Sequence, residues 1–221
     1  MRFLRPTPRR IAVLVAATIG VGAGAAYAAS LSVGSWHLWA GSQTLTKATC
    51  TVTGSTATTD TYVTQATPGG TNGNSGQIIV QSNSSSRDWG FVRFDLSGCG
   101  IPTTGGADSA TLSLFLSATP GSNRTIAVTP VLSTWSNSLT WTSAQSLSYG
   151  STTTTFTTGT SGNVARTATV TADVDALIKS SSANFGWRLT DTGTGNHTTT
   201  FASSSDGTAS HRPTLTINYE K

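Results

Sequence analysis

Charged residues are scarce in this chain of 221 residues, at 10% of the total, against about a quarter in an ordinary soluble protein. Glutamate occurs once, at Glu220, so the strong helix formers are depleted. This shortage argues against a helical bundle and against an ordinary α/β enzyme. Long apolar runs are also missing after residue 28, where no segment approaches the roughly 20 apolar residues of a membrane span.

Hydroxyl-bearing side chains are abundant instead. Ser and Thr make up about a third of the chain, and there are 23 Gly. Thr, Val, Ile and aromatic residues occur in short runs between Gly, Ser and Asn, a pattern typical of strands and turns. Six Trp and seven Phe can support a core, which argues against disorder.

The first 28 residues predict a secretory signal peptide. Four Arg precede an apolar run over residues 11–26, and Ala26-Tyr27-Ala28 matches a small-x-small cleavage site. The alternative is an uncleaved N-terminal anchor. Cleavage leaves nine basic and nine acidic residues, and a neutral protein lacks the positive surface that nucleic-acid binding needs. We therefore expect a secreted, extracellular protein, free or held at the cell surface, with no nucleic-acid partner and no membrane contact after cleavage.

Two cysteines, Cys50 and Cys99, follow the signal peptide. In an exported chain such a pair is more often bridged than free, so we expect a disulfide. In the chain-entropy model it would contribute roughly 4 kcal/mol. The alternative is two buried thiols. No further ligands stand at metal spacing, so we expect no zinc site.

Short runs with alternating apolar residues recur through the rest of the chain. They predict an all-β fold, a jelly-roll-like β-sandwich of antiparallel strands. Apolar residues within 173–180 recur at helical spacing after an Asp, which predicts one short helix. We expect a lead-in segment over residues 29–48 and a single domain over residues 49–221. The predicted strands are residues 49–53, 61–65, 77–81, 90–96, 110–118, 125–132, 153–158, 166–172, 185–190, 198–203 and 214–219.

The period of two assigns each strand residue to a face. Val92 and Phe94 share an apolar face, which leaves Phe91 and Arg93 on the other. By the same count Phe115 lies on a polar face. The two Phe side chains on polar faces therefore either contact a covering loop or the lead-in segment, or form a platform for a ligand.

Several short motifs, in order along the chain, resemble the secreted DNRLRE domain, which is classified as carbohydrate-binding module family 96. The resemblance covers residues 59–221 and implies a jelly-roll-like β-sandwich that binds polysaccharide. Some relatives grip acidic polysaccharides through basic residues, whereas the mature chain here has three Lys and no excess of positive charge. The matching motifs include Asp60-Thr61-Tyr62-Val63, Arg93-Phe94-Asp95-Leu96-Ser97, Leu139-Thr140-Trp141, Thr200-Phe201-Ala202-Ser203-Ser204 and Arg212-Pro213-Thr214-Leu215-Thr216-Ile217-Asn218-Tyr219.

Catalytic constellations are missing from the sequence. Glycoside hydrolysis needs two facing carboxylates, and the nearest pair, Asp173 and Asp175, is better explained as N-terminal residues of the predicted helix. The three His are far apart in the sequence. We therefore expect no enzyme. A small hydrolase remains an alternative only if the His or Asp residues converge in one cleft.

Sugar binding requires a planar aromatic ring and a few fixed polar groups. Trp89 follows a polar turn and could present its ring at a sheet edge, although packing at the end of the sandwich is an equal alternative. The other three Trp of the domain, at 135, 141 and 187, are expected to be core or loop anchors. The predicted carbohydrate-binding residues are Trp89, Arg87, Arg93, Phe115 and Tyr149.

No cofactor is expected, with a structural calcium ion as the weaker alternative. Residues 191–196 and the Asp206-Gly207 pair could supply oxygen ligands, but Asx turns explain them better. The sequence thus predicts a secreted, non-catalytic carbohydrate-binding module that recognises an extracellular polysaccharide. The alternative is a structural or adhesive surface protein that self-assembles or links surface polymers.

Overall fold

The computed structural model describes residues 30–33, 36–39, 45–83, 85–180 and 183–221. Contacts divide the chain into a unit that ends at Thr44 and a larger unit, Leu45–Lys221. In the first unit, β1 (Ser30–Val33) and β2 (Trp36–Trp39) pair as an antiparallel hairpin, which was not predicted within the lead-in segment. The predicted signal peptide, residues 1–28, lies outside the described residues.

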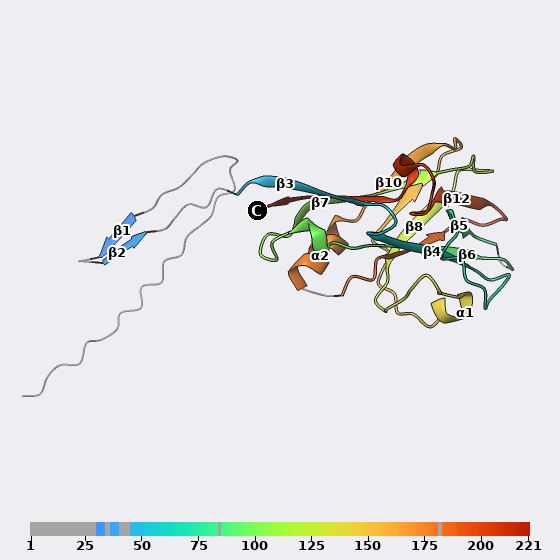
Figure 1. The fold of residues 1–221 in the computed structure, drawn as a ribbon, viewed down its shortest axis with the longest axis horizontal. Helices are drawn as coiled ribbons and strands as arrows, with labels where there is room; N and C mark the ends of the chain where they lie inside the picture. The colour runs from blue at the N-terminus through green and yellow to red at the C-terminus, as the bar shows by residue number, and fades with distance from the viewer. Residues whose placement is uncertain (1–29, 34–35, 40–44, 84, 181–182) are drawn as a thin grey trace, which may run out of the picture. The chain divides into compact units, whose positions relative to one another are not determined.

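The larger unit is built from antiparallel strands (Figure 1). Each predicted run overlaps one of these strands. The strands are β3 (Lys47–Thr53), β4 (Thr58–Thr64), β5 (Gln77–Gln81), β6 (Asp88–Phe94), β7 (Ala107–Leu116), β8 (Thr125–Pro130), β9 (Thr154–Thr157), β10 (Val164–Thr169), β11 (Trp187–Asp191), β12 (Thr198–Ala202) and β13 (Thr214–Glu220). The all-β prediction is confirmed.

The strands form the two layers of a β-sandwich. One layer has the order β3-β13-β7-β10, and the other has β4-β6-β11-β8-β9. The pair β5-β12 connects the layers, because Phe201 of β12 pairs with Leu116 of β7 and Gln81 of β5 pairs with Asp88 of β6. Hydrogen bonding is therefore continuous from one layer to the other.

The core lies between the layers and follows the predicted alternation. Val92 and Phe94 of β6 and Leu112 and Leu116 of β7 are fully buried in one hydrophobic cluster. The opposite face of β6 is also covered. Phe91 is fully buried there, in a second cluster formed by the long connection between β8 and β9. The prediction of a covering loop over Phe91 is confirmed.

Short helices complete the fold. The helix predicted for residues 173–180 is present as α2 (Thr171–Ser180), between β10 and β11. The four-residue helix α1 (Trp141–Ala144) was not predicted, since it is too short to show a period. A capping box between Thr140 and Ser143 starts it. Two 3₁₀ turns, η1 (Ser97–Cys99) and η2 (Ala209–His211), were not predicted either. Among the described residues no helix has the length and apolar character needed to cross a membrane.

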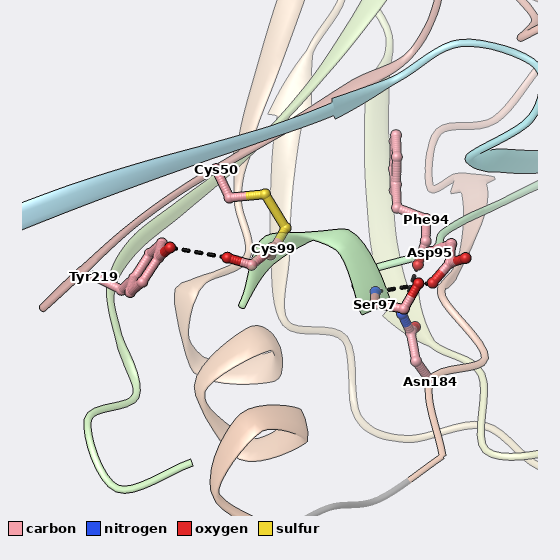
Figure 2. The surroundings of a disulfide bond; sticks show 7 residues. All are labelled: Cys50, Phe94, Asp95, Ser97, Cys99, Asn184 and Tyr219. Atoms are coloured by element: carbon pink, nitrogen blue, oxygen red, sulfur yellow. Dashed lines mark hydrogen bonds between the residues drawn. A yellow bond between two sulfur atoms is a disulfide. The ribbon is translucent and has the colours of Figure 1, made fainter. Parts of the chain in front are cut away.

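The predicted disulfide between Cys50 and Cys99 is confirmed, with a Cα–Cα distance of 5.5 Å. Figure 2 shows that it joins β3 to η1. The Tyr219 hydroxyl donates a 2.9 Å hydrogen bond to the carbonyl of Cys99, so β13 holds the same turn from a second side. The end of β6 is thereby tied to the opposite layer.

Candidate functional site

A polar groove of about 610 Å³ lies where β5 ends and β6 and β11 meet. Its volume falls within the roughly 300–1,000 Å³ of known ligand clefts. Two loops form its walls, the turn between β5 and β6 and the loop between β11 and β12. The lining residues are Gln81, Ser82, Asn83, Arg87, Trp89, Thr190, Asp191, Thr192, Gly193, Thr194, Gly195 and Asn196.

A buried ion pair holds both walls in place. Arg124, which directly precedes β8, binds Asp191 through Nε (2.7 Å) and Nη2 (3.0 Å). The same guanidinium donates to the hydroxyl of Ser82 on one wall (2.7 Å) and to the carbonyl of Thr194 on the other (3.1 Å). The side chains of Arg124 and Asp191 are 7% and 0% exposed. Low exposure and bidentate geometry make this a strong pair.

Gly193 is required by this arrangement. A Cβ atom on Gly193 would lie 2.5 Å from Nη2 of Arg124. Any side chain there would therefore push the guanidinium away from Asp191. The loop can approach Arg124 only because residue 193 has no side chain.

Amide side chains supply the groove with fixed polar groups. Nε2 of Gln81 donates to Oδ1 of Asn196 (2.6 Å), and the Thr198 hydroxyl donates to Oε1 of Gln81 (2.9 Å). Asn196 is exposed and Asn83 is half-buried. Each amide carries both donors and acceptors, which is the combination that sugar hydroxyls can use.

Trp89 is both part of the groove and part of the second hydrophobic cluster. Its ring lies 4.4 Å from the ring of Trp141 and makes an edge contact with Tyr149 at 6.5 Å. The guanidinium of Arg188 lies 4.7 Å from the Trp89 ring and 3.8 Å from the Tyr149 ring. These contacts hold the Trp89 indole in place on one side, and only part of its surface lines the groove.

Burial changes the titration of this cluster. It raises the pKa of the Tyr149 hydroxyl and lowers the pKa of the Arg188 guanidinium. Among the described residues no carboxylate lies within ion-pair distance of Arg188. Its guanidinium lies over the Trp89 and Tyr149 rings instead, and such cation–π contacts stabilise a positive charge.

The predicted sugar-binding residues separate into three places. Trp89 and Arg87 line the groove, and Tyr149 packs under Trp89. Arg93 lies four residues further along β6, in another depression of about 460 Å³, where its guanidinium is 5.4 Å from the Trp135 ring. Phe115 is on β7 in the other layer and stacks on His211 with ring centroids 3.8 Å apart.

Other groove residues were missed by sequence reasoning. Gln81 ends a predicted strand, and polar residues at strand ends carry no distinctive signal. Residues 191–196 were noticed only as oxygen ligands for calcium. The Asp191 carboxylate is instead engaged by Arg124, and it also accepts the Gly193 amide at 2.8 Å. In the part of the chain that the structure describes, no three His, Cys, Asp or Glu side chains gather as a metal site.

Comparison with known proteins gives one family. The family model described as carbohydrate-binding module family 96 matches residues 51–219, which is more than half of the chain. A search of curated proteins finds no match.

Proposed function

This chain belongs to carbohydrate-binding module family 96, and from that premise we propose that it is exported and binds an extracellular polysaccharide in the groove beside Trp89, without catalysis. The observation that carries the location is the combination in one groove of an immobilised indole with exposed and half-buried amides. An indole offers an apolar surface to sugar C–H groups, and the amides can exchange hydrogen bonds with sugar hydroxyls.

The acidic residue that lines the groove supports binding rather than hydrolysis. Asp191 is the acidic residue of the lining, and both of its oxygens are occupied by Arg124. A glycoside hydrolase needs two carboxyl groups free to exchange protons or attack the sugar. An ion-paired carboxylate serves neither purpose.

Export is supported by the sequence of residues 1–28 and by the disulfide. A bridge between Cys50 and Cys99 is stable in an oxidising compartment and rare in a reducing one. The mature chain is nearly free of net charge, so we propose a neutral polysaccharide as the ligand of the groove.

The test is retention of the mature, oxidised protein on neutral polymers (cellulose, chitin, xylan) and acidic ones (alginate, pectin). The groove variant combines Arg87→Ala with Asn196→Ala, two exposed side chains that the core does not need. Asn74→Ala, an exposed Asn outside this groove, is the matched control. We expect retention on a neutral polymer that falls at least tenfold in the groove variant and is unchanged in the control.

Two results would contradict the proposal in different ways. Retention that is equal in the wild type and the groove variant would show that the binding site lies elsewhere on the molecule. Absence of retention on every polymer would contradict polysaccharide binding itself.

A further inference from the structure

The outer face of the layer β3-β13-β7-β10 carries an ordered array of hydroxyl groups. The register places side chains of the four strands in rows across the sheet, and the residues that point outward are almost all Thr and Ser. We name this surface the hydroxyl face. Its rows are Thr53-Thr214-Ser113-Thr167, Thr51-Thr216-Thr111-Thr169 and Thr49-Asn218-Ser109.

The hydroxyl face is open among the described residues of the larger unit. Its members are exposed or half-buried, whereas the alternate residues on the same strands, such as Leu112, Leu215 and Ile217, are fully buried. The outer face of the other layer differs, because the β8–β9 connection covers it with aromatic side chains. The two outer faces of the sandwich therefore have different chemistry.

Hydrogen bonds between strands hold the array in a defined arrangement. The Thr49 hydroxyl donates to Oδ1 of Asn218 (2.7 Å), and Nδ2 of Asn218 donates to the Ser109 hydroxyl (2.9 Å). The hydroxyl of Thr214 donates to that of Thr53 (3.3 Å). Thr is also restricted at χ1 because it is branched at Cβ. A ligand bound to this face would restrict little additional side-chain freedom.

No charged side chain interrupts the three rows. The charged residues on these four strands are Lys47 and Glu220, which lie opposite each other in the β3–β13 register at one end, the exposed Asp108 next to Ser109, and Arg166 next to Thr167. At the other end Phe115 stacks on His211, and both rings are partly exposed. The face thus combines hydroxyl donors and acceptors with one apolar ring pair, and it offers an acidic polymer no cation within the rows.

We infer that the hydroxyl face is a second polysaccharide-binding surface, specific for a neutral chain, and that the molecule can therefore hold two chains at once. The inference rests on the proposed function, since it assigns a second site to the same class of ligand. Sugar hydroxyls, which both donate and accept, pair with the Thr and Ser rows, and the Phe115–His211 pair contacts the apolar side of a sugar ring. Two sites on different layers give avidity toward a polymer that presents many copies of the ligand.

The experiment places an arginine in the middle of the face. Thr216→Arg lies in the central row between Thr51 and Thr111, where it adds a charge and blocks the rows on either side. Thr155→Arg is the matched control, because Thr155 is an exposed strand residue of β9, which pairs with β8 outside the hydroxyl face. The double variant Thr111→Val with Thr216→Val removes two hydroxyls while keeping side-chain shape and strand propensity. A loss of retention in this variant therefore reports the missing hydroxyls and not a misfolded protein.

On the neutral polymer that retains the wild type, we expect the Thr216→Arg and double Val variants each to lose at least fivefold in retention. The control is expected to match the wild type. Combined with the groove variant, Thr216→Arg is expected to abolish retention, while either change alone leaves part of it. Thermal unfolding of each variant verifies that it is folded.

Three outcomes would overturn the inference. If the groove variant alone abolishes retention and the face variants match the wild type, the second surface is wrong and the proposed function stands. If no polymer retains the wild type, both fail. If Thr216→Arg instead abolishes self-association in sedimentation velocity without changing retention, the face binds a second copy of the chain and no polysaccharide.

Discussion

At the scale of single residues, the buried carboxyl groups show how local burial sets pH behaviour. Asp60 and Asp88 are 3% and 7% exposed. Burial raises the pKa of both, although Ser204 partly offsets this at Asp60 and Thr64 partly offsets it at Asp88. A raised pKa means that the folded state disfavours the charged form. Their contribution to stability is therefore complete below the unfolded pKa, roughly 3.9, and is lost as pH rises through the folded pKa.

Asp88→Asn is expected to increase the stability of the protein at pH 7 by about 1 kcal/mol or more, because an ionised oxygen, Oδ1, is buried there without a hydrogen-bond partner among the described residues. At pH 3 the substitution should have little effect, since the carboxyl is then neutral in both states. Urea unfolding at the two pH values measures the difference. Asp108→Asn, at an exposed position, is the control, and an equal gain at both pH values would contradict the assignment.

Asp95 titrates in the opposite direction. The backbone amide and hydroxyl of Ser97 lower the pKa of this exposed carboxyl, which accepts the amide at 2.9 Å (Figure 2). Its contribution to stability is present above the unfolded pKa and is lost as pH falls through the folded pKa. Asp95 therefore favours the folded state on the neutral side of its titration, whereas Asp60 and Asp88 favour it on the acid side.

Arg124→Ala is expected to destabilise the fold by about 3–5 kcal/mol, because it leaves the buried Asp191 carboxylate unpaired. The double variant Arg124→Leu with Asp191→Leu should recover a large part of that loss, since no charge is then left buried. Thermal or urea unfolding compares the two. A double variant that is less stable than Arg124→Ala would show that the pair contributes mainly through its hydrogen bonds to Ser82 and Thr194.

At the scale of elements, the β8–β9 connection acts as a second packed layer over β6 and β11. Its residues Trp135, Leu139 and Trp141 are buried against the sheet, and the Trp135 indole donates a 2.6 Å hydrogen bond to the carbonyl of Phe185. The three Trp predicted as core or loop anchors are 2–5% exposed, which confirms that interpretation. This connection also supports one wall of the groove, because Trp89 rests on Trp141.

Trp141→Ala is expected to cost about 3–5 kcal/mol, as for other large-to-small changes at buried aromatic residues. It should also weaken polysaccharide retention, since the Trp89 ring loses its support. Trp141→Phe keeps an aromatic surface and should retain most of both properties. Unfolding free energies and retention, measured on the same variants at a temperature where all are folded, separate the two effects. Unchanged retention in Trp141→Ala would show that the groove does not depend on this packing.

At the scale of the whole molecule, the disulfide connects parts of the chain separated by 49 positions. Replacing both Cys50 and Cys99 by Ala is expected to lower the free energy of unfolding by about 2–5 kcal/mol. The wild type under reducing conditions should approach the same value. Urea titrations with and without reductant test this, and the double variant itself should not respond to the reductant. A reductant effect in that variant would point to a cause other than this bridge.

Much of the fold could be predicted because strand signals are local. Alternation assigned Leu112 and Leu116 to the core, and residues 77–81 were predicted with the bounds that β5 has. Because the chain has two cysteines, their identity as the partners of the bridge followed from composition alone. The short elements α1, η1 and η2 escaped prediction because three or four residues carry no period.

The sequence by itself determined the strand content, the residues of β6 and β7 that face the central core, and the resemblance to a family, since all three depend on the order of neighbouring residues. Only the tertiary structure decided which distant residues meet. It placed Trp89 beside residues 190–196, placed the Arg188 guanidinium over two aromatic rings, and separated Arg93 and Phe115 from the groove. It also aligned Thr and Ser from four strands into rows. The physical reason is that strand register and layer packing are properties of the whole core, and no local period records them.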